Sequence, residues 1–223
     1  MKFIKDYLPE TEYHKIQHKK EQIYLHHTVS SSAASALNWW RQDNVRVATA
    51  YVIDKDGTIY ETFDPKGWSF HLGLKGTNGA IDKKSIGIEI VNEGWLNKKN
   101  NEFFWYDGKA KYRGPVFELD TEWRGQKYFA AYTEAQVKSA AIVTKILCYN
   151  LKIPFNFIGH LNYDKNLAEN FTGILTHCNV RLDKTDISPA FPMKEFIENV
   201  TYLENNPILP RGLELVGLND KEI

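Results

Sequence analysis

The alternation of apolar and polar residues divides the first part of the chain into strands and one helix. Residues 22–28 (QIYLHHT) form a short, β-prone apolar run, and the Ser/Thr cluster after it is suited to a helix N-cap, which predicts a helix over 33–42. In residues 47–63, two β-prone segments flank Asp56 and Gly57, a pair that favours the positive φ angles of a tight turn. We therefore expect a hairpin there.

A further strand is predicted over residues 84–92 (KSIGIEIVN). Its isoleucines alternate with Gly87 and Glu89, which is the two-residue period of a half-buried strand. Glu89 is therefore expected to point away from the apolar layer. Residues 93–132 then become aromatic and polar, which is typical of an inserted segment.

In the second half of the chain, Thr133 and Gln136 form the pattern of a capping box, and the helix that it starts should end before Pro154. The remaining predicted elements are a strand over 155–160, a loop over 162–173, a strand over 174–181 and a closing helix over 193–204. The expected organisation is an N-terminal arm over 1–22, one domain over 23–205 with its insertion at about 93–132, and a C-terminal tail over 206–223.

Composition excludes several classes of protein. The 223 residues are 43% hydrophobic and 25% charged, which is close to the average for globular proteins. Because Lys plus Arg and Asp plus Glu are equal at 28 each, no global charge favours nucleic acid or anionic membranes. No basic stripe interleaves with the aromatic residues, and no apolar run is long enough to span a bilayer. We expect a monomer with neither a nucleic-acid partner nor membrane insertion.

Histidine is the residue type that points to chemistry. Seven occur, and His26, His27, His71 and His177 fall at expected strand ends or turns, where a single histidine is most often a surface or hydrogen-bonding group. An early histidine at a strand end, together with His177 and Asp186, supplies two imidazoles and one carboxylate. This donor set suits a catalytic zinc, which keeps one coordination position open for water.

Five segments in order carry a family resemblance: LHHTVS (25–30), DKDGTIYETF (54–63), WSFHLG (68–73), SIGIEIVNEG (85–94) and HCNVRLDKTDISPAF (177–191). In this order they resemble the type 2 N-acetylmuramoyl-L-alanine amidase family, which is related to phage amidase lysozymes and animal peptidoglycan recognition proteins. The resemblance implies a single α/β domain, with a central mixed β-sheet flanked by helices, a zinc site in a surface cleft, and the aromatic segment as an insertion.

The resemblance also implies that His26, His177 and Asp186 hold Zn²⁺. Because neighbouring residues of a strand face opposite ways, His27 should then point elsewhere in the fold. His160 competes for the place of the second histidine, but it lies 26 residues before Asp186, whereas His177 lies nine residues before it, closer to the family's spacing. His160 is therefore expected in the core or behind the ligands.

Further roles follow from the same resemblance. Glu89 would move protons, and Lys184 would stabilise the negatively charged oxygen of the tetrahedral intermediate. Some relatives carry a tyrosine before the hairpin, where this chain has Thr49, and this difference favours the glutamate-using branch. Substrate contacts are expected from His71, Trp68 and Asn92.

The expected function is zinc-dependent hydrolysis of the amide bond between N-acetylmuramic acid and L-alanine in intact cell wall, as in phage endolysins. Two alternatives stay open, a module that binds muropeptide without cutting it and an intracellular amidase that recycles soluble wall fragments. The N-terminus shows no apolar secretion signal, so we expect synthesis in the cytoplasm and, for a lytic enzyme, holin-type release to the wall.

Overall fold

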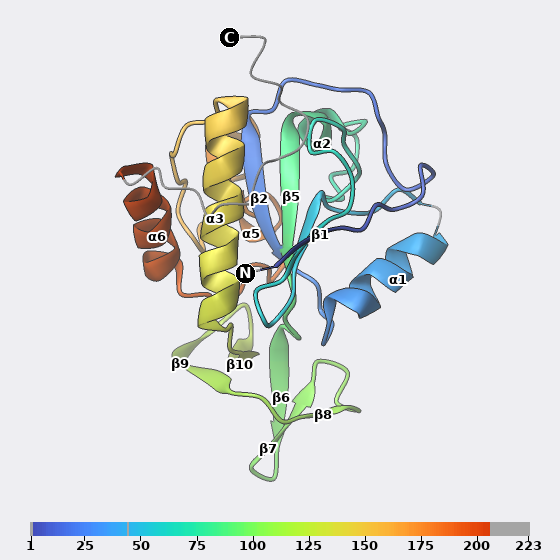
Figure 1. Ribbon diagram of the computed structural model, residues 1–223. Coiled ribbons are helices and arrows are strands. Elements are labelled where there is room, and N and C mark those ends of the chain that lie inside the picture. Colours follow the sequence, from blue (N-terminus) through green and yellow to red (C-terminus); the bar gives the residue numbers. More distant parts are fainter. Residues whose placement is uncertain (1, 44, 206–223) are drawn as a thin grey trace.

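The main feature of the fold is a six-stranded mixed sheet (Figure 1). The computed structural model describes residues 2–43 and 45–205, and the predicted tail over 206–223 lies outside the described residues. The strand order is β1-β4-β3-β5-β2-β11. The strands are β1 (Phe3–Lys5), β2 (Gln22–His27), β3 (Tyr51–Ile53), β4 (Ile59–Glu61), β5 (Ser85–Ile90) and β11 (Gly173–Thr176). Only the β3–β4 pair is antiparallel among these described strands.

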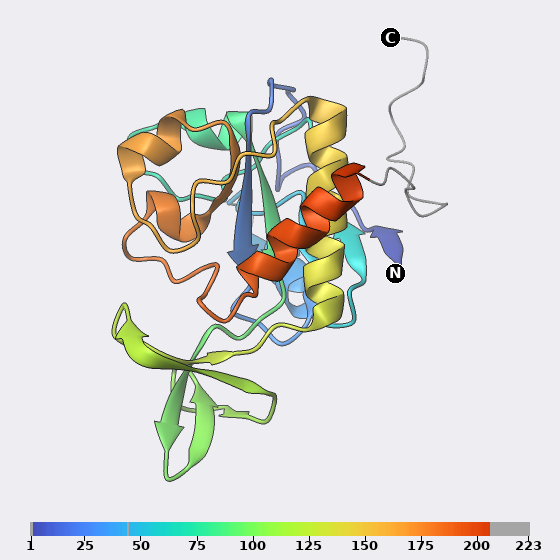
Figure 2. The ribbon, with the colours of Figure 1, turned by 90° about the vertical axis from the view of Figure 1, so that its left-hand side faces the viewer.

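Helices cover both faces of this sheet. They are α1 (Ala33–Asp43), α2 (Ala80–Lys84), α3 (Glu134–Leu151), α4 (Lys165–Asn170), α5 (His177–Val180) and α6 (Met193–Asn205). The long helix α3 packs on β3 and β5, and α6 packs on α3, whereas α4 and α5 lie on the opposite face (Figure 2). The predicted α/β domain with a mixed sheet flanked by helices is confirmed. Within the described part of the chain, no helix is long and apolar enough to cross a membrane.

The strands β2 and β5 contribute to two separate cores. Leu25 and Ile88 are fully buried in the main core beneath α3, and burying each such side chain stabilises the fold by about 1.5–3 kcal/mol. Tyr24 belongs to a smaller core on the other face, together with residues of α4 and α5. The predicted alternation in β5 is confirmed, because its isoleucines lie in the main core. Glu89 therefore faces the side of α4 and α5.

Two of the predicted turn and cap signals are also confirmed. Gly57, in the β3–β4 hairpin, has a φ of 82°, which glycine adopts without strain. The Thr133 side chain accepts a hydrogen bond from the Gln136 backbone, and the Gln136 side chain accepts one from the Thr133 backbone. This capping box starts α3 where the sequence pattern puts it.

The aromatic segment folds as a second, five-stranded antiparallel sheet with the order β8-β7-β6-β10-β9, which projects from one end of the domain (Figure 2). Its strands are β6 (Trp95–Lys99), β7 (Glu102–Trp105), β8 (Lys111–Tyr112), β9 (Val116–Trp123) and β10 (Gln126–Ala130). Leu96, Tyr112 and Ala130 form a small core of its own. The second sheet is thus a folded unit joined to the carboxyl end of β5.

The predicted strand over 155–160 is wrong. Among these residues only Phe157 makes a β-bridge, with Ile174, and the chain then turns at Gly159, whose φ is 111°. The Asn179 side chain donates to the Gly159 carbonyl at 2.9 Å, so this backbone oxygen is used by a side chain instead of a neighbouring strand. A side-chain contact across twenty residues has no local signature in the sequence.

Of two neighbouring predictions, one is wrong and the other is right only for residues 174–176. The expected loop over 162–173 contains α4, because the Asp164 carboxylate accepts from the Leu167 backbone at 2.9 Å and caps a helical turn. The expected strand over 174–181 ends at Thr176, where α5 begins. In both cases a short polar cap outweighs the local apolar pattern.

The N-terminal arm is part of the main sheet, because β1 pairs with β4 at its edge. Lys20, near the end of this arm, is only 4% exposed. Its ammonium donates to the carbonyls of Lys83 at 2.8 Å and Ser85 at 3.2 Å. Burial lowers the pKa of Lys20 to about 7, although Asp64 and Asp82 oppose the shift.

Replacing Lys20 by methionine should remove a pH dependence of stability. The unfolded chain holds the Lys20 proton up to a pKa of about 10.4, so between pH 7 and that value the unfolded state binds more protons and wild-type stability rises with pH. The difference in free energy of unfolding between wild type and Lys20→Met should change by about 3 kcal/mol between about pH 7 and pH 9.5. Urea unfolding at both pH values measures it. Lys19→Met, at a side chain that is 86% exposed, is the control, and equal pH slopes for wild type and Lys20→Met would contradict the account.

Candidate metal centre

His26 and His27 close β2 and point to opposite faces of the sheet. His26 shares the face of Tyr24, and the β2–β5 register pairs it with Glu89. His27 lies on the side of the main core, where its Nδ1 is 3.1 Å from the Tyr132 hydroxyl. The orientation expected from strand alternation is therefore observed.

His177 is brought beside His26 by the pairing of parallel strands. Thr176, the last residue of β11, lies opposite Leu25 of β2, so the next residue of each strand falls at the same edge of the sheet. Thr176 and Asn179 form a capping box that starts α5 at His177. The position of His177 is thus fixed by the register of β11 and by the cap of α5 together.

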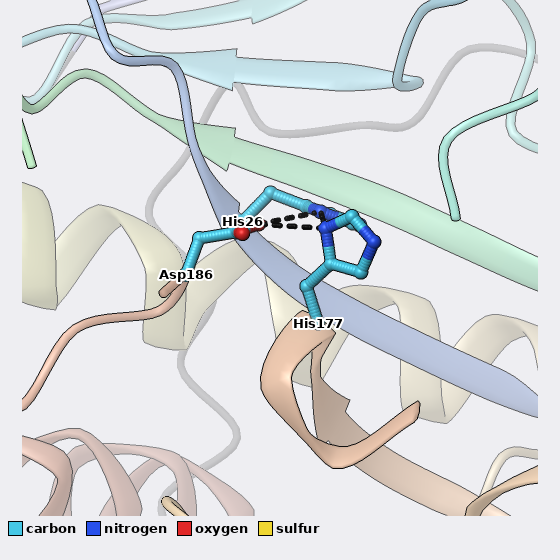
Figure 3. Close-up of side chains that lie close together, drawn as sticks. All are labelled: His26, His177 and Asp186. Carbon is cyan, nitrogen blue, oxygen red and sulfur yellow. Dashed lines mark hydrogen bonds and ion pairs between the residues drawn. The ribbon is translucent and has the colours of Figure 1, made fainter. Parts of the chain in front are cut away.

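Asp186 completes a compact cluster with the two histidines, which we call the ligand cluster (Figure 3). The Nδ1 atoms of His26 and His177 are 3.0 Å apart, and Asp186 Oδ2 lies 3.0 Å from the first and 2.9 Å from the second. The three residues are 2%, 4% and 7% exposed. Tetrahedral zinc with bonds of about 2.0 Å would hold its ligand atoms about 3.3 Å apart, close to these separations.

The hydrogen bonds around His177 fix its protonation. Its Nε2 lies 3.0 Å from the Leu72 carbonyl, which can only accept, so Nε2 carries the proton. The His177 Nδ1 atom then points toward Asp186 Oδ2, which lies 2.9 Å away. Burial would raise the pKa of Asp186, but contacts with His177 and His26 hold it well below its usual range.

A second chain of hydrogen bonds fixes His26 in the same way. Its Nε2 lies 2.9 Å from His71 Nδ1, and His71 Nε2 lies 2.8 Å from Ser85 Oγ, which in turn donates to the Asp82 carbonyl at 3.4 Å. Because the carbonyl can only accept, Ser85 donates to it, and His71 donates to Ser85 from Nε2. His26 then donates from Nε2 to His71 Nδ1, which leaves His26 Nδ1 unprotonated. Burial, with His177 adding to it, lowers the pKa of His26 to about 4. Three possible ligand atoms, one from each residue of the cluster, thus converge in an arrangement that fits Zn²⁺.

Asp82 anchors the groups behind both histidines. Its Oδ1 accepts from the backbone amides of His71 at 2.9 Å and Leu72 at 3.0 Å. The first of these residues contacts His26 through its side chain, and the second contacts His177 through its carbonyl. Asp82 is 2% exposed and was not predicted, because it acts only through the backbone of another segment.

Replacing Asp82 by alanine should weaken zinc binding by about 10–100-fold, as other losses of groups behind metal ligands do. Competition with a chromophoric chelator measures the affinity. Asp82→Asn keeps an oxygen acceptor and should retain most of it, and Asp107→Ala, at an exposed position of the second sheet, should have no effect. Wild-type affinity in Asp82→Ala would show that the 71–72 backbone does not depend on this carboxylate.

Glu89 lies beside the ligand cluster, since the β2–β5 register pairs it with His26. Glu89 Oε2 is buried and has no hydrogen-bond partner among residues 2–43 and 45–205. Burial raises the pKa of Glu89 well above its usual range, Asp186 adds to the shift, and the Lys184 ammonium opposes it. Glu89 therefore holds a proton more readily than an exposed glutamate does, and its Oε2 is free of internal hydrogen bonds among the described residues.

The remaining predicted residues lie apart from the cluster or behind it. Both ring nitrogens of His71 are used within the protein, so it supports His26 and has no free nitrogen for a substrate. Trp68 is 7% exposed and stacks on His14. Asn92 is 1% exposed, and its amide donates to the Ala130 carbonyl. These three placements do not favour substrate contact.

His160 is not part of the ligand cluster. Its ring lies beside the backbone of Ile187 and Ser188, and burial lowers its pKa to about 4. The structure thus brings His177, and not its competitor, to His26 and Asp186.

An open surface groove is lined by residues that are neighbours in the sequence of groups in or behind the cluster. Gly73 and Leu74 line one part of it, Tyr163 and Lys165 another, and residues 181–183 a third. Gly73 directly follows the Leu72 carbonyl that contacts His177, and residues 181–183 directly precede Lys184.

The sequence pattern of the N-acetylmuramoyl-L-alanine amidase family matches residues 17–186, a range that holds the ligand cluster, Glu89 and Lys184. No curated protein matches significantly. Among solved structures, the catalytic domain of XlyA is 14% identical over 90% of this chain and 99% of its own, with a TM-score of 0.54.

Two further structures share the fold. A mutant endolysin from Bacillus subtilis is 16% identical over 90% of this chain and 99% of its own, with a TM-score of 0.54. The amidase AmiD from E. coli, in complex with anhydro-N-acetylmuramic acid-L-Ala-D-gamma-Glu-L-Lys, is 16% identical over 83% of this chain and 59% of its own, with a TM-score of 0.53. Since the family pattern spans most of the sequence and the fold agrees with it, this chain belongs to the N-acetylmuramoyl-L-alanine amidase family.

Proposed function

We propose that this enzyme is zinc-dependent and hydrolyses the amide bond between N-acetylmuramic acid and L-alanine, with the metal held by His26, His177 and Asp186. The observation that carries the proposal is the convergence of three ligand atoms, two imidazole nitrogens and one carboxylate oxygen, within 3.0 Å of one another in a buried site. When bound, zinc would supply a Lewis acid that makes water nucleophilic near neutral pH and polarises the amide carbonyl.

Glu89 is the proposed proton carrier. Its buried, unpaired Oε2 would take a proton from the attacking water and deliver it to the alanine nitrogen as the C–N bond breaks. The products are the lactyl carboxylic acid of the sugar and a peptide with a free amino group, so atoms and protons balance. A carboxylate with a raised pKa is suited to both proton transfers.

Lys184 is the proposed partner of the developing negative charge. Its ammonium acts electrostatically on Glu89 and on His26, which supports a position at the face of the cluster. A fixed cation there would offset the charge on the carbonyl oxygen as water adds to the amide carbon.

We propose intact wall as the substrate, in a lytic role like that of endolysins. The second sheet supports this choice, because Tyr106 and Phe117 are 48% and 38% exposed on it and could stack on sugar rings. The solved structures with this fold include both an endolysin and an amidase complexed with a soluble anhydro-muropeptide. The soluble-fragment role therefore remains the second candidate.

Turnover on two substrates separates these roles. The lytic enzyme should release peptide from insoluble sacculi faster than it cleaves soluble anhydro-muropeptides at equal amide concentration. Activity confined to the soluble substrate would support the recycling role instead. No cleavage of either substrate by zinc-loaded protein would leave a binding module and refute hydrolysis.

A further inference from the structure

Arg124, in the turn between β9 and β10, reaches from the second sheet to the loop that carries Asp186. In Figure 2 this turn lies on the same side of the molecule as the loop that follows α5. The Arg124 guanidinium carbon is 4.7 Å from the centre of the Trp123 ring, so the neighbouring residue supports its side chain. The contact links two parts of the chain about sixty residues apart.

The loop over 178–186 presents its carbonyl groups to this guanidinium. Arg124 Nη2 donates to the Cys178 carbonyl at 3.1 Å, and Nη1 donates to the carbonyls of Arg181, at 3.1 Å, and Lys184. The Cys178 amide donates to the Asp186 carbonyl at 2.8 Å and closes the loop. Three backbone acceptors thus converge on one cation.

This loop has little regular structure of its own. Helix α5 is four residues long, and its last carbonyls have no partner within the helix. Beyond it, Leu182 is 64% exposed. Converging carbonyl dipoles repel one another, and a planar group with five N–H donors and no acceptor can satisfy several of them at once.

We infer that Arg124 is a positioning residue for the metal centre. By binding the backbone of the 178–186 loop, it fixes the placement of Asp186 and Lys184, and the second sheet becomes a structural part of that centre. The inference rests on the proposed roles of these two residues. The sequence does not indicate this role, because Arg124 lies in the aromatic segment, about sixty residues before the loop that it contacts.

The test compares Arg124→Ala and Arg124→Lys with wild type and with Arg113→Ala, an exposed arginine of the same sheet. The zinc dissociation constant should rise by about 10-fold or more in Arg124→Ala. Amide hydrogen exchange of residues 178–186 in the metal-free protein should accelerate. With zinc saturating, kcat on purified peptidoglycan should fall more than KM rises. Arg113→Ala should match wild type in all three measurements.

Two further experiments, the Arg124→Lys variant and rescue by free guanidinium, distinguish loss of loop positioning from general destabilisation of the fold. Arg124→Lys keeps the charge but cannot span three carbonyls, so it should fold as wild type and still lose zinc affinity by about 3-fold or more. Free guanidinium at low, non-denaturing concentration should partly restore zinc affinity in Arg124→Ala. Wild-type zinc affinity and exchange in both Arg124 variants would overturn the inference. If the wild-type protein bound no zinc, the proposed function would fail, while faster loop exchange in Arg124→Ala would still report the positioning contact.

Discussion

Asp186→Ala is expected to abolish stoichiometric zinc binding and to lower kcat/KM by at least about 10³-fold. The substitution removes the carboxylate of the ligand cluster and leaves two imidazole nitrogens 3.0 Å apart. Metal-ion catalysis contributes several kcal/mol of transition-state stabilisation, and about 4 kcal/mol corresponds to a factor of about 10³ in rate. Zinc content by elemental analysis and turnover on peptidoglycan measure the two effects.

Asp183→Ala is the matched control for Asp186→Ala. It removes a carboxylate from the same loop, but the Asp183 side chain is 65% exposed and pairs with Arg181 instead of the histidines. This variant should bind zinc like wild type. Retention of both zinc and activity in Asp186→Ala would refute the ligand assignment.

Glu89→Gln is expected to lower kcat by about 10²–10⁴-fold while zinc stays bound, because glutamine has the size of glutamate but cannot accept a proton in turnover. The buried Oε2 has no hydrogen-bond partner among the described residues, so the substitution should break no internal contact of that atom. Steady-state turnover on peptidoglycan, with zinc content measured on the same samples, separates the loss of proton transfer from the loss of metal.

Glu93→Gln controls for the cost of altering a buried carboxylate. Glu93 is 4% exposed and pairs with Lys55 at 2.5 Å, in the segment that follows β5. The control should lower thermal stability without a comparable loss of kcat. Wild-type kcat in Glu89→Gln would remove Glu89 from the mechanism and leave only the metal and Lys184.

The parts of the fold that the sequence predicts well are those whose signals are local. Alternation in β5, the turn at Gly57 and the capping box at Thr133 each depend on residues within a few positions of one another. Between 155 and 181 the predictions hold only for the strand at 174–176, because Asp164 and Asn179 direct the backbone elsewhere through side-chain hydrogen bonds. Short polar caps of this kind compete with weak apolar patterns.

The residues of the candidate site also fall into those that the sequence indicates and those that only the fold reveals. Strand alternation distinguishes His26 from His27, and the family resemblance names the remaining residues of the cluster. Asp82 and Arg124 escape prediction because each acts on backbone groups of a segment that only the fold brings near. Asn92, a polar residue in a family motif, joins the two sheets through the Ala130 carbonyl, a structural contact that the sequence does not indicate.

The central claim is that this chain cuts the bond between N-acetylmuramic acid and L-alanine and needs zinc in the ligand cluster to do so. Mass spectrometry of the products from purified peptidoglycan, treated with zinc-loaded or metal-stripped protein, tests it most directly. The account predicts free lactyl carboxylate on the sugar and peptides that begin with L-alanine, formed with zinc, absent after stripping and restored when zinc is returned. Intact substrate at full zinc occupancy, or cleavage at a different bond, would contradict it.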